Sequence, residues 1–279
     1  MWKTYETASG TRESVVRPVL DLENNSKWRG EMMPLNKPSG NMYENIWTWS
    51  PFGGECPHKC VYCYVLNKIG PWQKRLGNTK YCGEVRLIER ELKTKLVTPN
   101  DEPIFVQSLG DMFAEEVASK DIERVLEHCN KFPTTRFLFQ SKNPGRFSDF
   151  IGDFPGRSIL GTTIETNREG DEYCVSEGPS PWERYSSLNA IEQRCKMVSI
   201  EPIMKFDFEI LSAWLWDIPG LAYVSIGADS GKNDLPEPTP EEIHELIQDL
   251  QRFVEVRLKK NLLELYDPKE FEEGLLAWC

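Results

Sequence analysis

The sequence alternates short β-forming runs with amphipathic helical runs, and this alternation limits the fold more than any other feature. Six runs are predicted strands because they are rich in β-branched and aromatic residues and are bounded by turn-forming residues. They cover residues 45–50, 103–108, 135–140, 158–164, 196–200 and 221–226. Strands that alternate with helices form parallel sheets with right-handed crossovers. The sequence therefore predicts an α/β fold, a partial (β/α)6 TIM-like barrel, since eight units would need more chain.

Helical patterns occupy most of the intervals between these strands. Apolar residues recur at helical spacing in residues 84–96, 117–129, 181–195, 208–216 and 239–256, and a short helix is expected at 61–66. Ser180 and Thr239 are predicted to cap two of these helices, and Pro240 suits a first helical turn.

Three regions follow from the pattern along the chain. Residues 1–44 are rich in Gly and Pro and form a predicted N-terminal extension, residues 45–231 form the core, and residues 232–279 form a helical, acidic C-terminal segment. No stretch approaches the roughly 20 consecutive apolar residues that span a bilayer. The N-terminus has no apolar signal region. We therefore expect a cytoplasmic protein that does not bind membranes.

The charge is acidic overall, with 33 Lys and Arg against 44 Asp and Glu, a net charge of −11. This sign argues against sequence-blind coating of DNA. Residues 1–99 nevertheless carry a net charge of +5. A local basic face for a phosphate-bearing substrate is one interpretation of that excess, and solvated surface charge is the other.

Three of the eight cysteines, Cys56, Cys60 and Cys63, lie within eight residues and can converge on one metal centre. A structural zinc site needs four ligands, and the fourth would be His58 or a distant cysteine, because no second Cys-x-x-Cys exists. A [4Fe–4S] cluster accommodates three thiolates, one on each of three irons, and leaves the fourth iron open. The terminal Cys279 is either a frayed thiol or an additional metal contact.

Polar residues follow the predicted strands, where parallel β/α folds bind their ligands. The candidates are Gly110, Asp111, Ser141, Lys142, Glu165, Asn167 and Glu201. Each also has a simpler interpretation, such as a turn Asp at 111 or a solvated Lys at 142. Cys174 lies in the loop after the fourth strand and is either a hydrogen-atom donor or an ordinary loop cysteine. Tyr62 covers a cofactor or packs in the core.

The Cys-x3-Cys-x2-Cys spacing, with Tyr62 before the last cysteine, resembles the signature of the radical S-adenosylmethionine (SAM) superfamily. The segments WTWSPFGGECPHKCVYCYV, SLGDMF, FLFQSKNPGRF, LGTTIETN, VSIEPIM and IGADSG occur in this order. This order of segments resembles that of a phage-protein-like family of the superfamily, which is related to spore photoproduct lyase. The resemblance covers about residues 45–231, and its match to the superfamily's Gly-Gly-Glu-like motif, at Gly110 and Asp111, is loose.

The resemblance implies which residues serve the cofactors. Cys56, Cys60 and Cys63 would hold a [4Fe–4S] cluster whose open iron binds the amino and carboxylate groups of SAM. Gly110 and Asp111 would hold the SAM amino group, and Ser141 and Lys142 its carboxylate. Glu165 and Asn167 would take the ribose hydroxyls, and Glu201 would line the adenine or the substrate.

The implied activity is reductive cleavage of SAM to a 5′-deoxyadenosyl radical, which abstracts hydrogen from a substrate. A reducing protein would donate the electron. A nucleotide or nucleic acid is favoured as the substrate by analogy and local charge, with a peptide or small metabolite as the alternative. A different class of function stays open, in which the cysteines form a metal knuckle in an adaptor that binds nucleic acid or a partner protein.

Overall fold

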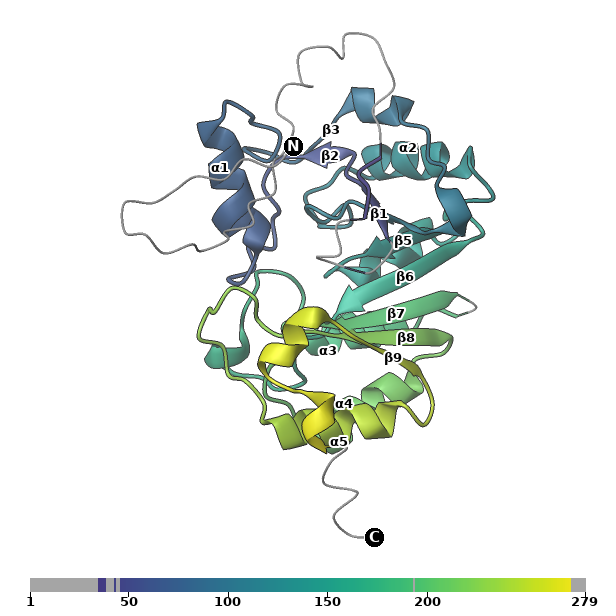
Figure 1. Ribbon diagram of the computed structural model, residues 1–279. Helices are drawn as coiled ribbons and strands as arrows, with labels where there is room; N and C mark the ends of the chain where they lie inside the picture. The colour runs from purple at the N-terminus through teal and green to yellow at the C-terminus, as the bar shows by residue number, and fades with distance from the viewer. Residues whose placement is uncertain (1–34, 39–42, 44–45, 193, 272–279) are drawn as a thin grey trace. The chain divides into compact units, whose positions relative to one another are not determined.

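The computed structural model describes residues 35–38, 43, 46–192 and 194–271, which leaves Cys279 and most of the predicted N-terminal extension outside the described residues. Within them, seven strands form a parallel sheet in the order β1-β4-β5-β6-β7-β8-β9 (Figure 1). The strands are β1 Trp47–Trp49, β4 Ile104–Val106, β5 Phe137–Gln140, β6 Ser158–Thr163, β7 Cys195–Ile200, β8 Leu221–Ile226 and β9 Glu255–Leu258. A separate antiparallel pair joins β2 Phe52–Gly53 to β3 Arg86–Leu87.

All six predicted strands are present, and the predicted partial α/β barrel is confirmed. The two edge strands, β1 and β9, do not pair with each other in the described sheet, so the barrel is open. Consecutive strands are neighbours in a single parallel direction, as expected for repeated strand–helix units with crossovers.

Strand β9 is the seventh strand, and it corrects the predicted C-terminal helix. Helix α5 (Pro240–Leu250) ends well before residue 256, and Glu255–Leu258 then pairs with β8. Val256 packs against the main core, whereas the guanidinium of Arg257 lies over the ring of Tyr223 at 3.6 Å on the opposite face. The alternation of apolar and charged residues in 254–258 is a strand period, and it was missed because the preceding helical pattern runs directly into it.

The longer helices begin where the sequence predicts. They are α2 Ser119–Asn130, α3 Pro181–Asn189, α4 Phe208–Asp217 and α5. Ser180 and Thr239 each form a capping box at the start of α3 and α5, as their sequence positions indicate. A short helix, α1 (Gly70–Arg75), follows a helical turn at Val65–Ile69, slightly later than the helix expected at 61–66. Within the described chain, no helix is both long and apolar enough to cross a membrane.

The helix predicted at 84–96 is wrong. Arg86–Leu87 is instead strand β3, paired with β2, and Glu89–Lys93 forms a 3₁₀ helix. Val85, Leu87 and Leu92 still pack against the main core, so the apolar spacing was identified correctly. A short strand followed by a tight helical turn can space its apolar residues much as a single helix does. Periodicity alone does not distinguish these two arrangements.

The two faces of the sheet differ in character. Helices α2 to α5 pack on one face, where their apolar side chains share one large core with alternate strand residues such as Phe139 and Val198. The opposite face carries a small apolar cluster that includes Leu138, Met197 and Tyr223. Every second residue of a strand points to the same face. Ser199, two positions after Met197, therefore also belongs to this second face.

Towards the carboxyl ends of the strands, the second face therefore becomes polar. It carries Gln140, Thr163, Ser199, Ser225 and Glu201, most of them buried. Buried polar side chains at this end of a parallel sheet are the usual setting of a ligand site.

Candidate cofactor site

The three clustered cysteines lie in the loop that follows β1 and β2, and all three are free thiols. The loop begins at Gly54, which has φ +98°, and a Cβ there would lie 2.3 Å from the carbonyl oxygen of Glu84. Only glycine fits such a position without displacing the neighbouring backbone. A turn within the loop is closed by the Cys63 N–H, which donates to the Cys60 carbonyl at 3.0 Å.

Burial governs the electrostatics of the thiols. It raises the pKa of Cys56 to about 12, with a further contribution from the charge of Asp111. Burial also raises the pKa of Cys60, while the nearby charge of Lys142 opposes the shift. A bound cationic centre reverses this balance because it stabilises thiolates directly. The donor set fits a cluster that takes three thiolates.

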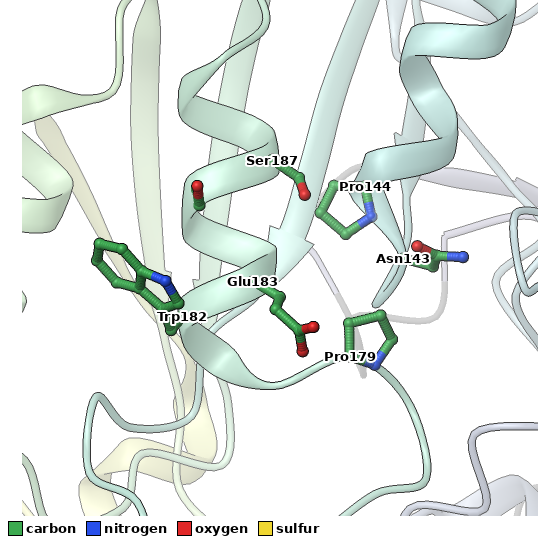
Figure 2. A pocket seen from close by; sticks show the side chains of 7 residues that line it. Asn143, Pro144, Pro179, Trp182, Glu183 and Ser187 are labelled. Carbon is green, nitrogen blue, oxygen red and sulfur yellow. The ribbon is translucent and has the colours of Figure 1, made fainter.

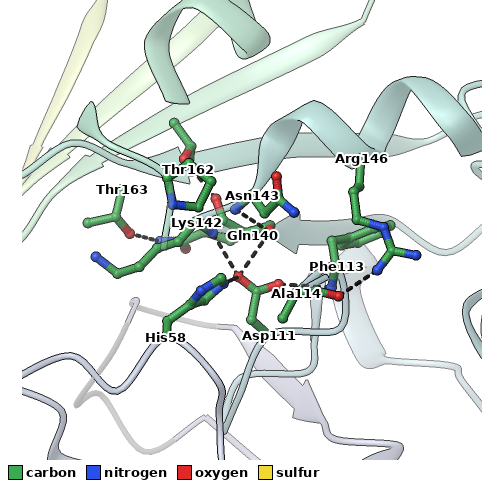
Figure 3. A network of polar contacts seen from close by, with 12 residues as sticks. His58, Asp111, Phe113, Ala114, Gln140, Lys142, Asn143, Arg146, Thr162 and Thr163 are labelled. Carbon is green, nitrogen blue, oxygen red and sulfur yellow. Dashed lines mark hydrogen bonds and ion pairs between the residues drawn. The ribbon is translucent and has the colours of Figure 1, made fainter. Parts of the chain in front are cut away.

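The described residues contain no set of three or more His, Cys, Asp or Glu side chains close enough to hold a single metal ion. His58, the sequence candidate for a fourth ligand, is engaged elsewhere. Its Nε2 donates a hydrogen bond to Asp111 Oδ2 at 2.8 Å. The His58 side chain is thus part of a buried polar network and not of a metal-ligand set (Figure 3).

Asp111 is the centre of that network. Oδ2 also accepts from the Ser141 hydroxyl at 2.9 Å and from the Lys142 backbone N–H at 2.7 Å, and Oδ1 accepts from the Phe113 N–H at 2.9 Å (Figure 3). Burial opposes ionisation, but the bonds from His58 and the backbone outweigh it and lower the pKa of Asp111.

The carboxylate of Asp111 thus fastens the cysteine loop to the segments that follow β4 and β5. The resemblance implied that Asp111 and Ser141 serve SAM, and the structure places both beside His58 of the cysteine loop. Four donors already occupy the carboxylate. Gly110 lies next to it, where a Cβ would come within 2.8 Å of Gln107 Nε2.

A second buried network surrounds Glu165, just beyond the end of β6. Lys142 Nζ and the Tyr62 hydroxyl both donate to Oε1, and Arg184 Nη1 donates to Oε2 at 2.7 Å. Lys142 Nζ also donates to the Tyr62 hydroxyl at 2.6 Å. Burial would raise the pKa of Glu165, but the charges of Arg184 and Lys142 lower it to about 2.

This network has a positive excess. Within the described residues, Glu165 is the single carboxylate that pairs with Lys142 or Arg184, so two cations share one anion. All three charged side chains are at most 10% exposed. The excess positive charge lies close enough to the cysteine loop to influence Cys60.

The other predicted site residues are placed differently. The amide of Asn167 bonds to the backbone of Asp207 at both its ends, at 3.0 and 2.9 Å. Glu201 pairs with Lys259 and accepts from Asn261 Nδ2 at 3.0 Å. Cys174 is exposed, and its thiol has a single weak contact, with the Ser176 carbonyl.

Sequence reasoning missed Arg184, Lys259 and Asn261. Arg184 is 2% exposed on α3, and a charged residue within the apolar stripe of a helix was the available signal. Lys259 and Asn261 follow β9 and reach the end of β7 through Glu201. They were missed because the strand before them was interpreted as helix.

A pocket of about 260 Å³ lies between the turn after β5 and the start of α3 (Figure 2). It is lined by Asn143, Pro144, Pro179, Trp182, Glu183, Ser186 and Ser187. No residue that the sequence assigns to the cluster or to SAM lines it. The candidate site is therefore the polar strand-end region beside the cysteine loop and not this pocket.

Residues 46–249 match a protein family described as "Protein of unknown function (DUF5131)". The chain belongs to this family. No curated protein matches the chain at a significant level. The family description gives no activity, so it leaves the function to be inferred from the site and the fold.

The fold is similar to that of spore photoproduct lyase. A structure of that enzyme "complexed with dinucleoside spore photoproduct" aligns with a TM-score of 0.52 and 12% identity over 75% of each chain. A mutant "with bound AdoMet and dinucleoside spore photoproduct" aligns with a TM-score of 0.54 and 12% identity over 75% of each. Another point mutant of that enzyme aligns with a TM-score of 0.53 and 13% identity over 76% of each chain. At this identity the likeness shows the fold alone, and it agrees with the partial α/β barrel that the sequence predicts.

Proposed function

We propose that this protein is a radical SAM enzyme that holds a [4Fe–4S] cluster through Cys56, Cys60 and Cys63. The observation that carries the proposal is the position of three free thiols in one loop, beside a buried network with excess positive charge, in a fold of this type. When bound, the cluster supplies the electron that cleaves SAM to a 5′-deoxyadenosyl radical.

Lys142 is proposed to orient the carboxylate of SAM. Two buried cations face one carboxylate in the Glu165 network, so a second carboxylate would balance the charge. Lys142 is about 10% exposed, whereas Arg184 is 3% exposed, so the lysine is the cation nearer to an entering ligand. Glu165 and Tyr62 hold its ammonium group in place through the contacts described above.

Asp111 and Ser141 are proposed to shape the SAM site by fixing the backbone around it. Their hydrogen bonds join the loop that carries Gly110, the backbone of Lys142 and His58 of the cysteine loop. Asn167, Glu201 and Cys174 stay candidates for the ribose, for the adenine or substrate, and for hydrogen-atom transfer. Residues 45–231 are the proposed radical SAM core, and α5 and β9 add a helix and an edge strand to the same sheet.

The proposed substrate is a nucleotide or nucleic acid. Two of the similar structures contain a dinucleoside spore photoproduct, and this analogy supports the proposal. A reducing protein is the proposed electron source, and such chemistry fits a reducing cytoplasm.

Anaerobic reconstitution tests the proposal. The chain is expected to bind about four irons and four sulfides, and dithionite with SAM is expected to release 5′-deoxyadenosine. Cys60→Ala removes a ligand and is expected to abolish both results, whereas Cys195→Ala, at an exposed thiol of β7, leaves them intact. A colourless, zinc-loaded protein that never cleaves SAM would support the metal-knuckle adaptor instead.

A further inference from the structure

The segment that begins at the end of the cysteine loop, residues 61–80, is an arm in which no residue is fully buried. It contains the helical turn Val65–Ile69 and helix α1, and neither has a buried residue. Most helices are stabilised by packing an apolar face, because short helices are marginal alone. An element that packs no side chain fully into the core keeps much of its surface available to bind another molecule.

The arm exposes a set of large apolar side chains. They are Val61, Tyr64, Leu66, Trp72 and Leu76, each between 38% and 54% exposed. Single exposed apolar residues are ordinary, but a concentration of them within 16 positions is typical of a protein-binding surface. Three of the five are aliphatic, which suits a protein partner better than the phosphates and bases of a nucleic acid.

The charge of the arm has one sign. Residues 61–80 contain four Lys and Arg and no Asp or Glu, and one of the four, Lys80, pairs with Glu91 at 2.9 Å. Lys68, Lys74 and Arg75 form no ion pair with any described residue. Unpaired cations in the same short segment as exposed apolar side chains indicate a partner whose surface combines acidic and apolar residues.

A basic hollow extends this surface at the end of the arm. It has a volume of about 410 Å³ and is lined by Gly77, Asn78, Thr79, Lys80, Arg86, Leu87, Ile88 and Arg90. The guanidinium of Arg86 bonds to the backbone carbonyls of Cys82, Glu84 and Thr79. These contacts fix the Arg86 side chain without neutralising its charge. Lys80 is already paired with Glu91, so Arg86 and Arg90 are the cations that the hollow offers to an acidic side chain of a partner.

The arm is joined directly to the cysteine loop. The Asn67 N–H donates to the Cys63 carbonyl at 2.9 Å, and Asn67 Nδ2 donates to the Val61 carbonyl at 2.7 Å. The Val61 N–H in turn donates to the Val175 carbonyl at 3.0 Å. A molecule bound to the arm is therefore held beside the thiols that are proposed to carry the cluster.

We infer that the arm is the docking surface for an acidic, one-electron carrier protein that supplies the reducing electron. This inference rests on the proposed function. In the step, the reduced carrier loses one electron and the oxidised cluster gains one, with no bond formed or broken between the proteins. Charge complementarity steers the two proteins together, and the exposed apolar side chains hold them during transfer.

A charge-reversed variant, K68E/K74E/R75E, tests the basic rim. The matched control, K95E/K120E/K131E, reverses as many exposed cations outside the arm. The probe is an acidic flavodoxin, whose Kd is measured by calorimetry with the full chain. The arm variant is expected to bind it at least tenfold more weakly than the unmodified chain, and the control less than threefold. Raising salt is expected to narrow the difference, because screening weakens rim charges.

A kinetic comparison tests whether this binding delivers electrons. The arm variant is expected to release 5′-deoxyadenosine at least tenfold more slowly with reduced flavodoxin, and at an unchanged rate with excess dithionite. Trp72→Ser, which removes one exposed aromatic side chain of the arm, is expected to weaken carrier binding without altering the thermal unfolding temperature.

Different failures have different meanings. If the unmodified chain releases no 5′-deoxyadenosine even with dithionite, the proposed function fails. If dithionite works but the arm variants keep the Kd and rate of the unmodified chain with flavodoxin, the docking surface is refuted. Loss of single-stranded oligonucleotide binding by the arm variant, with flavodoxin binding unchanged, also refutes it and assigns the arm to nucleic acid.

Discussion

Glu165→Gln is the most informative single substitution for the buried network. It preserves the shape of the side chain but removes the one carboxylate that pairs with Lys142 and Arg184 among the described residues. Two cations, about 10% and 3% exposed, are then left without a counter-charge. Breaking a buried ion pair by removing one partner typically costs 3–5 kcal/mol.

The pKa of Glu165 gives a second measure of the same cost. Its reduction from 4.5 to about 2 corresponds to about 3 kcal/mol, at about 1.4 kcal/mol for each pKa unit. The two figures agree, so we expect Glu165→Gln to lower the free energy of unfolding by about 3 kcal/mol. Urea unfolding of the cluster-free chain, followed by circular dichroism, measures the change.

A matched control is provided by an exposed pair. Lys59 and Glu177 lie 2.9 Å apart but are 59% and 61% exposed. Solvent screens exposed pairs, so Glu177→Gln is expected to leave the free energy of unfolding almost unchanged. Equal effects of the two substitutions would refute the argument that the Glu165 carboxylate compensates buried charge.

Three further predictions concern pH, the Asp111 network and the loop. The folded pKa of Glu165 lies below its unfolded value, so the stabilisation by its carboxylate is complete above about pH 4.5 and is lost as pH falls towards 2. The difference in unfolding free energy between the unmodified chain and Glu165→Gln should therefore shrink over that range. A constant difference contradicts the lowered pKa of Glu165. Asp111→Asn keeps one acceptor oxygen for four donors, so we expect it to lower the free energy of unfolding by roughly 2 kcal/mol. We also expect it to broaden the electron paramagnetic resonance signal of the reconstituted cluster. An unchanged spectrum argues against a positioning role of Asp111. Gly54→Ala forces a side chain into 2.3 Å contact with backbone at a positive φ, and should cost roughly 2–4 kcal/mol in urea unfolding, whereas a loss below 1 kcal/mol shows that the loop adapts.

The sheet was predictable because its signals are local. β-branched and aromatic runs such as 135–140 and 221–226 need no distant information, and both form strands. The rule that ligands bind at the carboxyl ends of parallel strands also placed Asp111, Lys142 and Glu165 in one region, where the structure connects them through short networks.

The partners within the site were less predictable because they depend on tertiary contacts. Nothing local in the sequence pairs His58 with Asp111, which are 53 positions apart, or brings Arg184 to Glu165. The contact of Lys259 with Glu201 could be predicted only after the seventh strand was identified. Side chains assigned individually to cofactor atoms prove to bond mainly to one another.

The most direct test of the central claim is electron paramagnetic resonance of the reconstituted, dithionite-reduced chain, recorded with and without SAM. If Cys56, Cys60 and Cys63 hold a cluster with one open iron, the reduced protein gives a spin-½ signal whose g values shift when SAM binds, and Cys60→Ala gives none. A signal that SAM leaves unchanged, or a chain that retains no iron under anaerobic conditions, contradicts the account.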